Sequence, residues 1–157
     1  MQTWAKVALG VAAWEAYWWH RRNVRRVQSF AEARALADAL GKPLVLVGAP
    51  DGGMTSGAGC GDVTIDLAGS SCPNSLRADV TKPLPFADDS AVVLVQYVLE
   101  YVGDYGAALR ELRRIAGPNL FVERVQPWTL TSLLYPGAQR TVPEQRPQLT
   151  ASALRRA

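Results

Sequence analysis

The sequence has few of the side chains from which metal sites and nucleophilic active sites are built. It contains one histidine, His20, and only two cysteines, Cys60 and Cys72. The cysteines do not have the spacing of metal ligands, so neither a structural zinc site nor a Cys/His nucleophile pair is predicted. Two cysteines also do not identify a redox compartment, and a disulfide between them is left open.

The chain also lacks a strong charge of either sign and any internal repeat. Its net charge is +3 and its pI is about 9.1, a bias too mild to predict nucleic-acid binding. Much of the positive charge lies in local clusters, at residues 20–26 and at Arg155–Arg156. With 157 residues and 48% hydrophobic residues, there is room for one packed domain and an appendage.

Aromatic residues are unevenly distributed, because four of the five tryptophans precede residue 20. The segment Trp4–Trp19 has no proline and consists mostly of helix-forming residues, and its aromatic ends would lie roughly 22 Å apart in a helix. Aromatic residues at both ends are typical of a helix that spans the ~30 Å hydrocarbon core. Lys6 and Glu15 are near enough to the ends to reach the membrane surface. We therefore predict a single transmembrane anchor at residues 1–20.

The arginines that follow orient this anchor. Arg21, Arg22, Arg25 and Arg26 place the rest of the chain on the cytoplasmic side by the positive-inside rule. Their proximity to the apolar helix indicates a topogenic role or contact with anionic lipid rather than with nucleic acid. His20 is interpreted as an interfacial residue.

Two alternatives to a spanning helix remain. The segment is short and carries two charges, which also fits an amphipathic helix lying in the membrane plane. The other alternative is a helix whose tryptophans pack on its own domain or on another subunit. A cleaved signal peptide is disfavoured, because the basic residues follow the apolar run instead of preceding it.

The rest of the chain alternates between strand and helix patterns, which predicts an α/β fold with a mainly parallel sheet. A helix is predicted at Ser29–Gly41, with Ser29 as N-cap and Gly41 as the C-terminal stop. A second is predicted at Tyr105–Ala116, capped by Asp104. Five strands are predicted at Leu44–Val47, Asp62–Leu67, Leu76–Val80, Ala91–Val98 and Asn119–Val125.

These patterns divide the chain into four parts. Residues 1–20 form the anchor and residues 21–41 a basic juxtamembrane segment and helix. Residues 42–126 form the α/β domain, and residues 127–157 a Pro-rich C-terminal arm. The arm, with Trp128 and Tyr135, either lies over a neighbouring protein or packs on its own domain.

Several strand ends carry a distinctive set of residues. The first strand ends at Gly48, the second at Asp66, and Asp79-Val80 follow the third. The segment Leu84–Ser90 precedes the fourth strand, and Val98–Val102 follows it. In this order, residues 42–126 resemble the class I S-adenosylmethionine-dependent methyltransferases. The resemblance implies a truncated Rossmann-like methyltransferase fold.

The same resemblance implies a cofactor site at these positions. Gly48 would open the glycine loop, and Asp66 would accept hydrogen bonds from the ribose hydroxyls. Asp79 would accept from the adenine amine, and Val80 would form an apolar wall beside the ring. These four residues are the predicted cofactor-binding set.

The chain departs from the family pattern in ways that bear on activity. Between the first two strands lie thirteen residues, 49–61, five of them glycine, where the family has a helix. This connection is barely long enough for a parallel crossover, and an antiparallel return is the alternative. Residues 127–157 show no convincing pair of closing strands, and Pro50 removes a backbone donor from the loop.

No catalytic residue and no metal ligand is predicted. Asp88, Asp89 and Glu100 are interpreted as solvated or capping carboxylates, and Gln96 and Tyr97 are the only polar residues at the end of the fourth strand. A tyrosine there is more often packing than chemistry. Methyl transfer needs no base when positioning suffices, so this absence does not exclude it.

The sequence thus predicts a single-pass membrane protein with a cytoplasmic domain, acting as an accessory or structural subunit of a hetero-oligomeric membrane assembly. Its partners would be lipids and membrane protein subunits, with no nucleic acid. The domain would be an inactive methyltransferase relative that needs no cofactor. An active S-adenosylmethionine-dependent methyltransferase acting on a lipid or membrane-associated substrate is the alternative, and a nucleotide- or metabolite-sensing module is the third.

Overall fold

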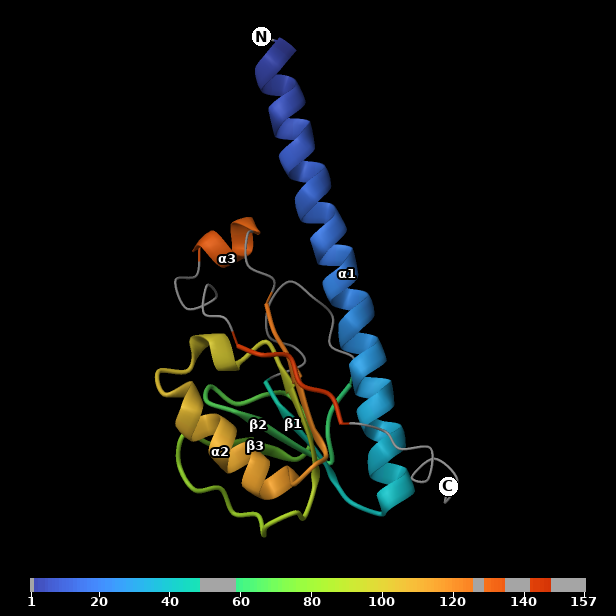
Figure 1. Ribbon diagram of the computed structural model, residues 1–157, viewed down its shortest axis with the longest axis vertical. Helices are drawn as coiled ribbons and strands as arrows, with labels where there is room; N and C mark the ends of the chain where they lie inside the picture. Colours follow the sequence, from blue (N-terminus) through green and yellow to red (C-terminus); the bar gives the residue numbers. More distant parts are fainter. Residues whose placement is uncertain (1, 49–58, 126–128, 135–141, 148–157) are drawn as a thin grey trace.

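Figure 1 shows a computed structural model of the chain, in which one long helix stands against a small α/β domain. The structure describes residues 2–48, 59–125, 129–134 and 142–147. Its elements are α1 (Gln2–Leu40), β1 (Leu44–Val47), β2 (Val63–Asp66), β3 (Ser75–Arg77), β4 (Val92–Gln96), the 3₁₀ helix η1 (Leu99–Tyr101), α2 (Tyr105–Ala116), β5 (Leu120–Glu123) and α3 (Leu130–Leu134). The predicted α/β class, the five strands and the helix α2 are confirmed.

The five strands form one parallel sheet in the order β3-β2-β1-β4-β5. The register pairs Val45 with Val63 and with Val93 on its other side. The connection from β1 to β2 is therefore parallel, and the antiparallel alternative is wrong. Among the described residues, this is the order of the first five strands of a Rossmann-type sheet. β3 is shorter than predicted and ends at Arg77, shortly before a turn in which the Lys82 amide donates to the Asp79 carbonyl oxygen.

Alternate residues of the strands face opposite layers, so the central strands are apolar throughout. In β1 and β4 the even-numbered positions pack under α1 and the odd-numbered positions pack on the α2 side, whereas in β5 Phe121 faces α1 and Leu120 and Val122 face α2. The α1 side contains Leu44, Leu46, Val92, Leu94 and Phe121, together with Ala33, Leu36 and Ala37 of the helix. The α2 side includes Val45, Val47, Val93, Val95, Leu112 and Ile115. In Figure 1 the sheet accordingly lies between the two helices.

The prediction of two N-terminal helices is wrong, because α1 runs without interruption from Gln2 to Leu40. Ser29 is not an N-cap but a buried mid-helix residue whose hydroxyl donates to the Arg26 carbonyl oxygen. The basic stretch that joins the two segments contains no proline or glycine, so nothing in it breaks the helix. Gly41 is confirmed as the stop, with φ of 62°.

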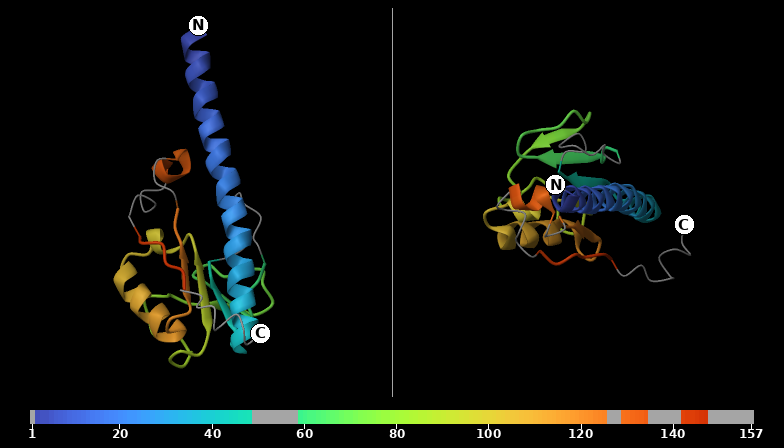
Figure 2. Two further views of the ribbon diagram at one scale, coloured as in Figure 1. Left: turned by 45° about the vertical axis from the view of Figure 1, so that its right-hand side comes forward. Right: turned by 90° about the horizontal axis from the view of Figure 1, so that it is seen from above.

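The N-terminal half of α1 extends beyond the domain (Figure 2). Among the described residues, no helix carries a stretch both long and apolar enough to cross a membrane. The predicted transmembrane helix at residues 1–20 is therefore not supported. Lys6 and Glu15 interrupt this stretch, and His20 and the arginines follow it directly.

The described parts of the C-terminal arm pack on their own chain. Gln145 forms an antiparallel bridge with Val122 of β5, and Val142 is fully buried in the core on the α2 side. Arg146 forms ion pairs with Glu32 of α1 and Glu123 of β5. The outer edge of β5 is thereby covered. Trp128 and Tyr135 lie outside the described residues.

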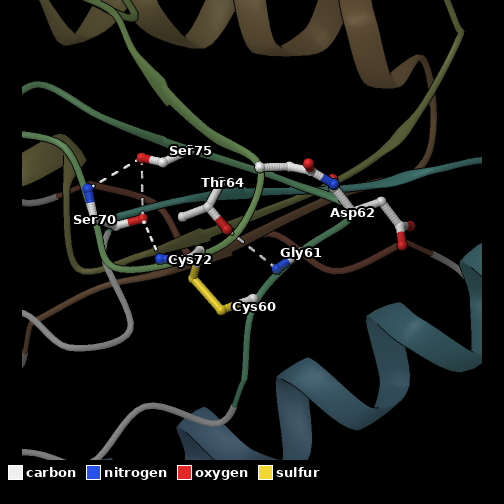
Figure 3. The surroundings of a disulfide bond; sticks show 8 residues. Cys60, Gly61, Asp62, Thr64, Ser70, Cys72 and Ser75 are labelled. Carbon is white, nitrogen blue, oxygen red and sulfur yellow. Dashed lines mark hydrogen bonds between the residues drawn. A yellow bond between two sulfur atoms is a disulfide. The ribbon is translucent and has the colours of Figure 1, made fainter.

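Cys60 and Cys72 form a disulfide, the option that the sequence left open. Figure 3 shows the bond between the segment that enters β2 and the loop that precedes β3. Nearby, the Gly61 amide donates to Thr64 Oγ1 at 3.2 Å, and the Cys72 amide donates to Ser70 Oγ at 3.3 Å. The covalent ring so closed contains the whole of β2, including Asp66.

We expect the double substitution Cys60→Ser, Cys72→Ser to lower the free energy of unfolding by about 2–4 kcal/mol, because an unlinked unfolded chain has more conformations. Urea denaturation measures the change. Dithiothreitol should lower the stability of the wild type to that of the variant and leave the variant unchanged. Equal stability of both oxidised proteins would contradict the expectation.

Candidate functional site: a pocket at the carboxyl ends of the strands

A pocket of about 530 Å³ opens at the carboxyl edge of the sheet. Its walls come from the ends of β1, β2 and β4, from the turn after β3, and from the segment between η1 and α2. The lining residues are Val47–Gly48, Ile65–Leu67, Ala78–Thr81, Tyr97–Val98 and Tyr101–Asp104. The chain leaves β1 for β2 on one side and returns to β4 on the other, and such a switch point is the usual ligand site of open α/β sheets.

All four residues of the predicted cofactor-binding set line this pocket. The structure thus brings Gly48, Asp66, Asp79 and Val80 together, although they come from three separate turns. Binding of a cofactor by them remains a prediction.

Gly48 occupies a place that admits no side chain. Its φ is 102°, and a Cβ would lie 2.7 Å from Val98 Cγ2 and 3.0 Å from the Gln96 carbonyl oxygen. Its amide donates to the Ile65 carbonyl oxygen at 2.9 Å. Glycine is therefore needed here to bring the end of β1 close to the end of β4.

The two aspartates are held by local turns. Asp66 Oδ1 accepts from the Ala68 amide at 2.8 Å, at the half-buried end of β2. Asp79 Oδ1 accepts from the Thr81 amide at 2.9 Å and from the Thr81 hydroxyl at 2.7 Å. These hydrogen bonds hold the pKa of the Asp79 carboxyl below its usual value. Beside it, the buried Val80 supplies an apolar wall.

Tyr97, which the sequence indicated only as a packing residue, makes specific contacts with α1. It adopts the left-handed region with φ of 58°, which is strained for a residue with a large side chain. Its hydroxyl donates to the Arg22 carbonyl oxygen at 3.3 Å, and the Arg26 guanidinium lies 5.6 Å from its ring centre. Burial raises the pKa of the phenol, so it stays protonated at neutral pH.

Arg26 corrects another sequence interpretation. We expected it to face lipid or to act only in topology, but 4% of it is exposed. Its Nε donates to Gln96 Oε1 at 3.5 Å, while Gln96 Nε2 donates to the Arg26 carbonyl oxygen at 3.0 Å and to Ser29 Oγ at 3.2 Å. Desolvation by burial lowers the pKa of the guanidinium. The end of β4 is thus fixed to the middle of α1.

Glu100 is also not the solvated carboxylate predicted. It is 1% exposed, and its Oε1 accepts from the Val125 amide. Its Oε2 has no hydrogen-bond partner among the described residues, and burial raises the pKa of the carboxyl. The sequence does not predict this burial, because it depends on the contact of Glu100 with Val125, which follows β5 and is 25 residues away along the chain. Glu100 does not line the pocket, although Tyr101 does.

Asp88 and Asp89 lie outside the pocket, at the opposite edge of the sheet. Asp88 forms an ion pair with Arg114 at 2.7 Å, and Asp89 with Lys42 at 2.8 Å. Both side chains are mostly exposed, so the prediction of solvated carboxylates is confirmed for these two.

The described part of the chain holds no group of three His, Cys, Asp or Glu side chains that would bind a metal ion. In comparisons with other proteins, no protein-family model, curated protein or solved structure matches the chain.

We expect Gly48→Ala to lower the free energy of unfolding by about 1–3 kcal/mol, because alanine is strained at this φ and its Cβ overlaps Val98. Gly103→Ala is the matched control. Gly103 also lines the pocket, but a Cβ there meets no atom within 4 Å. Urea denaturation of both variants measures the difference, and equal effects would contradict this account of Gly48.

Proposed function

We propose that the protein is an accessory or structural subunit of a membrane-associated hetero-oligomer, built on an inactive methyltransferase-like domain. The observation that carries this proposal is the N-terminal half of α1. Its large apolar side chains are unusually exposed: Trp4 79%, Val7 53%, Leu9 70%, Val11 42%, Trp14 48%, Tyr17 49% and Trp19 45%. Apolar surface of this extent on a folded protein indicates a surface that binds something else.

The pocket supports a binding or structural role more than chemistry. Several of its polar side chains hydrogen-bond to the surrounding backbone: Asp104 Oδ1 caps α2 through the Ala107 amide, and the Tyr97 hydroxyl donates to the Arg22 carbonyl oxygen of α1. Asp79 is engaged by Thr81. None of these groups is placed as a general base.

We propose the cytoplasmic side for the domain, because Arg21 and Arg22 at the base of the exposed half of α1 suit the anionic headgroups of the cytoplasmic leaflet. Arg26 is buried and gives no support to this orientation. The Cys60–Cys72 disulfide is the observation that favours the other side, since such bonds are typical of oxidising compartments.

Deletion of residues 2–13 should release the chain from its assembly. We expect the free energy of unfolding to change by less than about 0.5 kcal/mol, because the side chains of residues 3–13 are exposed. Sedimentation of the native complex, extracted from membranes, measures the loss of assembly. If the shortened chain stays in a complex of the original size, the proposal is wrong.

A second candidate is supported by the pocket itself. A volume of about 530 Å³ is in the range of small-molecule sites, and Asp66 and Asp79 stand at its edge as the resemblance to methyltransferases implies. On this basis an active S-adenosylmethionine-dependent methyltransferase, acting on a lipid or membrane-associated substrate, is the alternative function.

Calorimetry with S-adenosylmethionine and S-adenosylhomocysteine tests this alternative on the full chain. If it holds, Asp66→Asn and Asp79→Asn each weaken binding by about tenfold or more, because each loses a charged acceptor, a change of about 1.4 kcal/mol. Asp38→Asn, at an exposed position on α1, is the control and should leave affinity unchanged. No binding by the wild type rejects the alternative, and binding of another nucleotide supports a sensor.

A further inference from the structure

The exposed half of α1 has two different sides. Its bulky residues recur at alternating spacings of three and four: Trp4, Val7, Val11, Trp14 and Trp18. This spacing puts them on one face of the helix, as in the contact seam of a coiled coil. We call these five residues the heptad stripe. The opposite face is smaller, and consists of Ala5, Lys6, Leu9, Ala13 and Ala16.

The heptad stripe lies close to the side of α1 on which the chain packs a helix of its own. The Leu130 amide at the start of α3 donates to Glu15 Oε1 at 2.6 Å. Trp18, at the lower end of the stripe, is half-buried, and its ring meets those of Trp14 and Tyr17 edge-on at 5.5 and 5.2 Å. Toward Trp4 the stripe is uncovered, and Leu130 and Leu133 of α3 are 49% and 56% exposed.

This sidedness argues against a helix surrounded by lipid, and the narrow three-four spacing is that of a contact seam with another helix. Lipid around an inserted helix contacts every side, and such helices are apolar all round. Here every stripe position is bulky, while the opposite face carries Lys6, three alanines and Leu9 as its one bulky residue. One neighbouring helix, packed along the heptad stripe, would cover the five stripe side chains and leave Lys6 and Leu9 in solvent.

The positive charge of Arg21 and Arg22, just after the heptad stripe, indicates which charged residues the partner helix has. Arg21 donates to the Tyr17 hydroxyl at 2.9 Å, and neither Arg21 nor Arg22 forms an ion pair with a carboxylate of the described residues. The first acidic residue of the chain is Glu15. A second copy of α1 packed antiparallel would therefore bring the cationic N-terminal segment against these arginines, and a parallel copy would bring arginine against arginine. Both are repulsive.

We infer that the heptad stripe binds a helix of a different protein, whose apolar residues follow the same spacing and whose carboxylates lie level with Arg21 and Arg22. This inference rests on the proposed accessory function and names the surface and the chemistry of the partner.

Two substitutions of similar chemistry separate the faces. Val11→Glu places a carboxylate in the heptad stripe, and Leu9→Glu places one on the opposite face, where the wild-type side chain is 70% exposed. Both side chains are exposed, Val11 at 42% and Leu9 at 70%, so circular dichroism and urea denaturation should give the same fold and stability for both variants.

The probe is a synthetic helical peptide of about three heptads with leucine at the seam positions, long enough to run along the stripe and reach the level of Arg21 and Arg22. It is made with glutamates at one end, or with lysines there instead. Tryptophan fluorescence of the full chain reports binding. We expect the glutamate peptide to bind, the lysine peptide to bind about tenfold more weakly, and Val11→Glu to lose about tenfold or more in affinity. Leu9→Glu should change affinity by less than about twofold.

Other results overturn the inference. Equal losses of affinity in Val11→Glu and Leu9→Glu would show that binding does not depend on the face of the helix. Equal binding of the two peptides would show that it does not depend on the partner's charge. Binding of the wild type to vesicles of phosphatidylcholine and phosphatidylglycerol, with no peptide binding, would assign the surface to lipid. If the native assembly needs residues 2–13 but tolerates Val11→Glu, the inference fails and the accessory function stands. An assembly that does not need residues 2–13 rejects both.

Discussion

The structure depends on how α1 lies across one face of the sheet. Apolar contacts of residues such as Ala33 and Ala37 hold it there, and apolar contacts are not directional. The buried hydrogen bonds of Gln96 with Arg26 and Ser29 are directional and require one position. A buried amide that lost these partners would be left unsatisfied, at a cost of about 1–3 kcal/mol. The polar contact therefore fixes the register, while the apolar contacts supply most of the affinity.

The same contact connects the two functional features of the molecule. Gln96 is followed by Tyr97, which lines the pocket and whose hydroxyl reaches the backbone of α1. Hydrogen bonds therefore join the wall of the pocket to the middle of the helix whose N-terminal half is exposed. In an accessory subunit, a ligand in the pocket would stabilise the unit that presents the helix, without any reaction taking place.

Much of this fold was predictable, because strand ends and helix caps are local signals. The runs at β1 and β4 read as buried strands, and Asp104 and Gly41 mark helix ends in both sequence and structure. The parallel order then brings Gly48, Asp66 and Asp79 to one edge. Features that depend on distant contacts were missed. Ser29 has the composition of a cap but is held inside α1 by Gln96, and Glu100 is buried only because Val125 meets it.

The continuity of α1 has a mechanical consequence. A helix of 39 residues is about 58 Å long, and it is clamped to the sheet only along its C-terminal half. Such an element is a lever whose fulcrum lies near Arg26. A sideways force on the free arm at Trp4 is transmitted as torque to the residues around Gln96 and Tyr97, where the backbone is already strained. A partner that binds the N-terminal end of α1 therefore also exerts force on Tyr97 in the wall of the pocket.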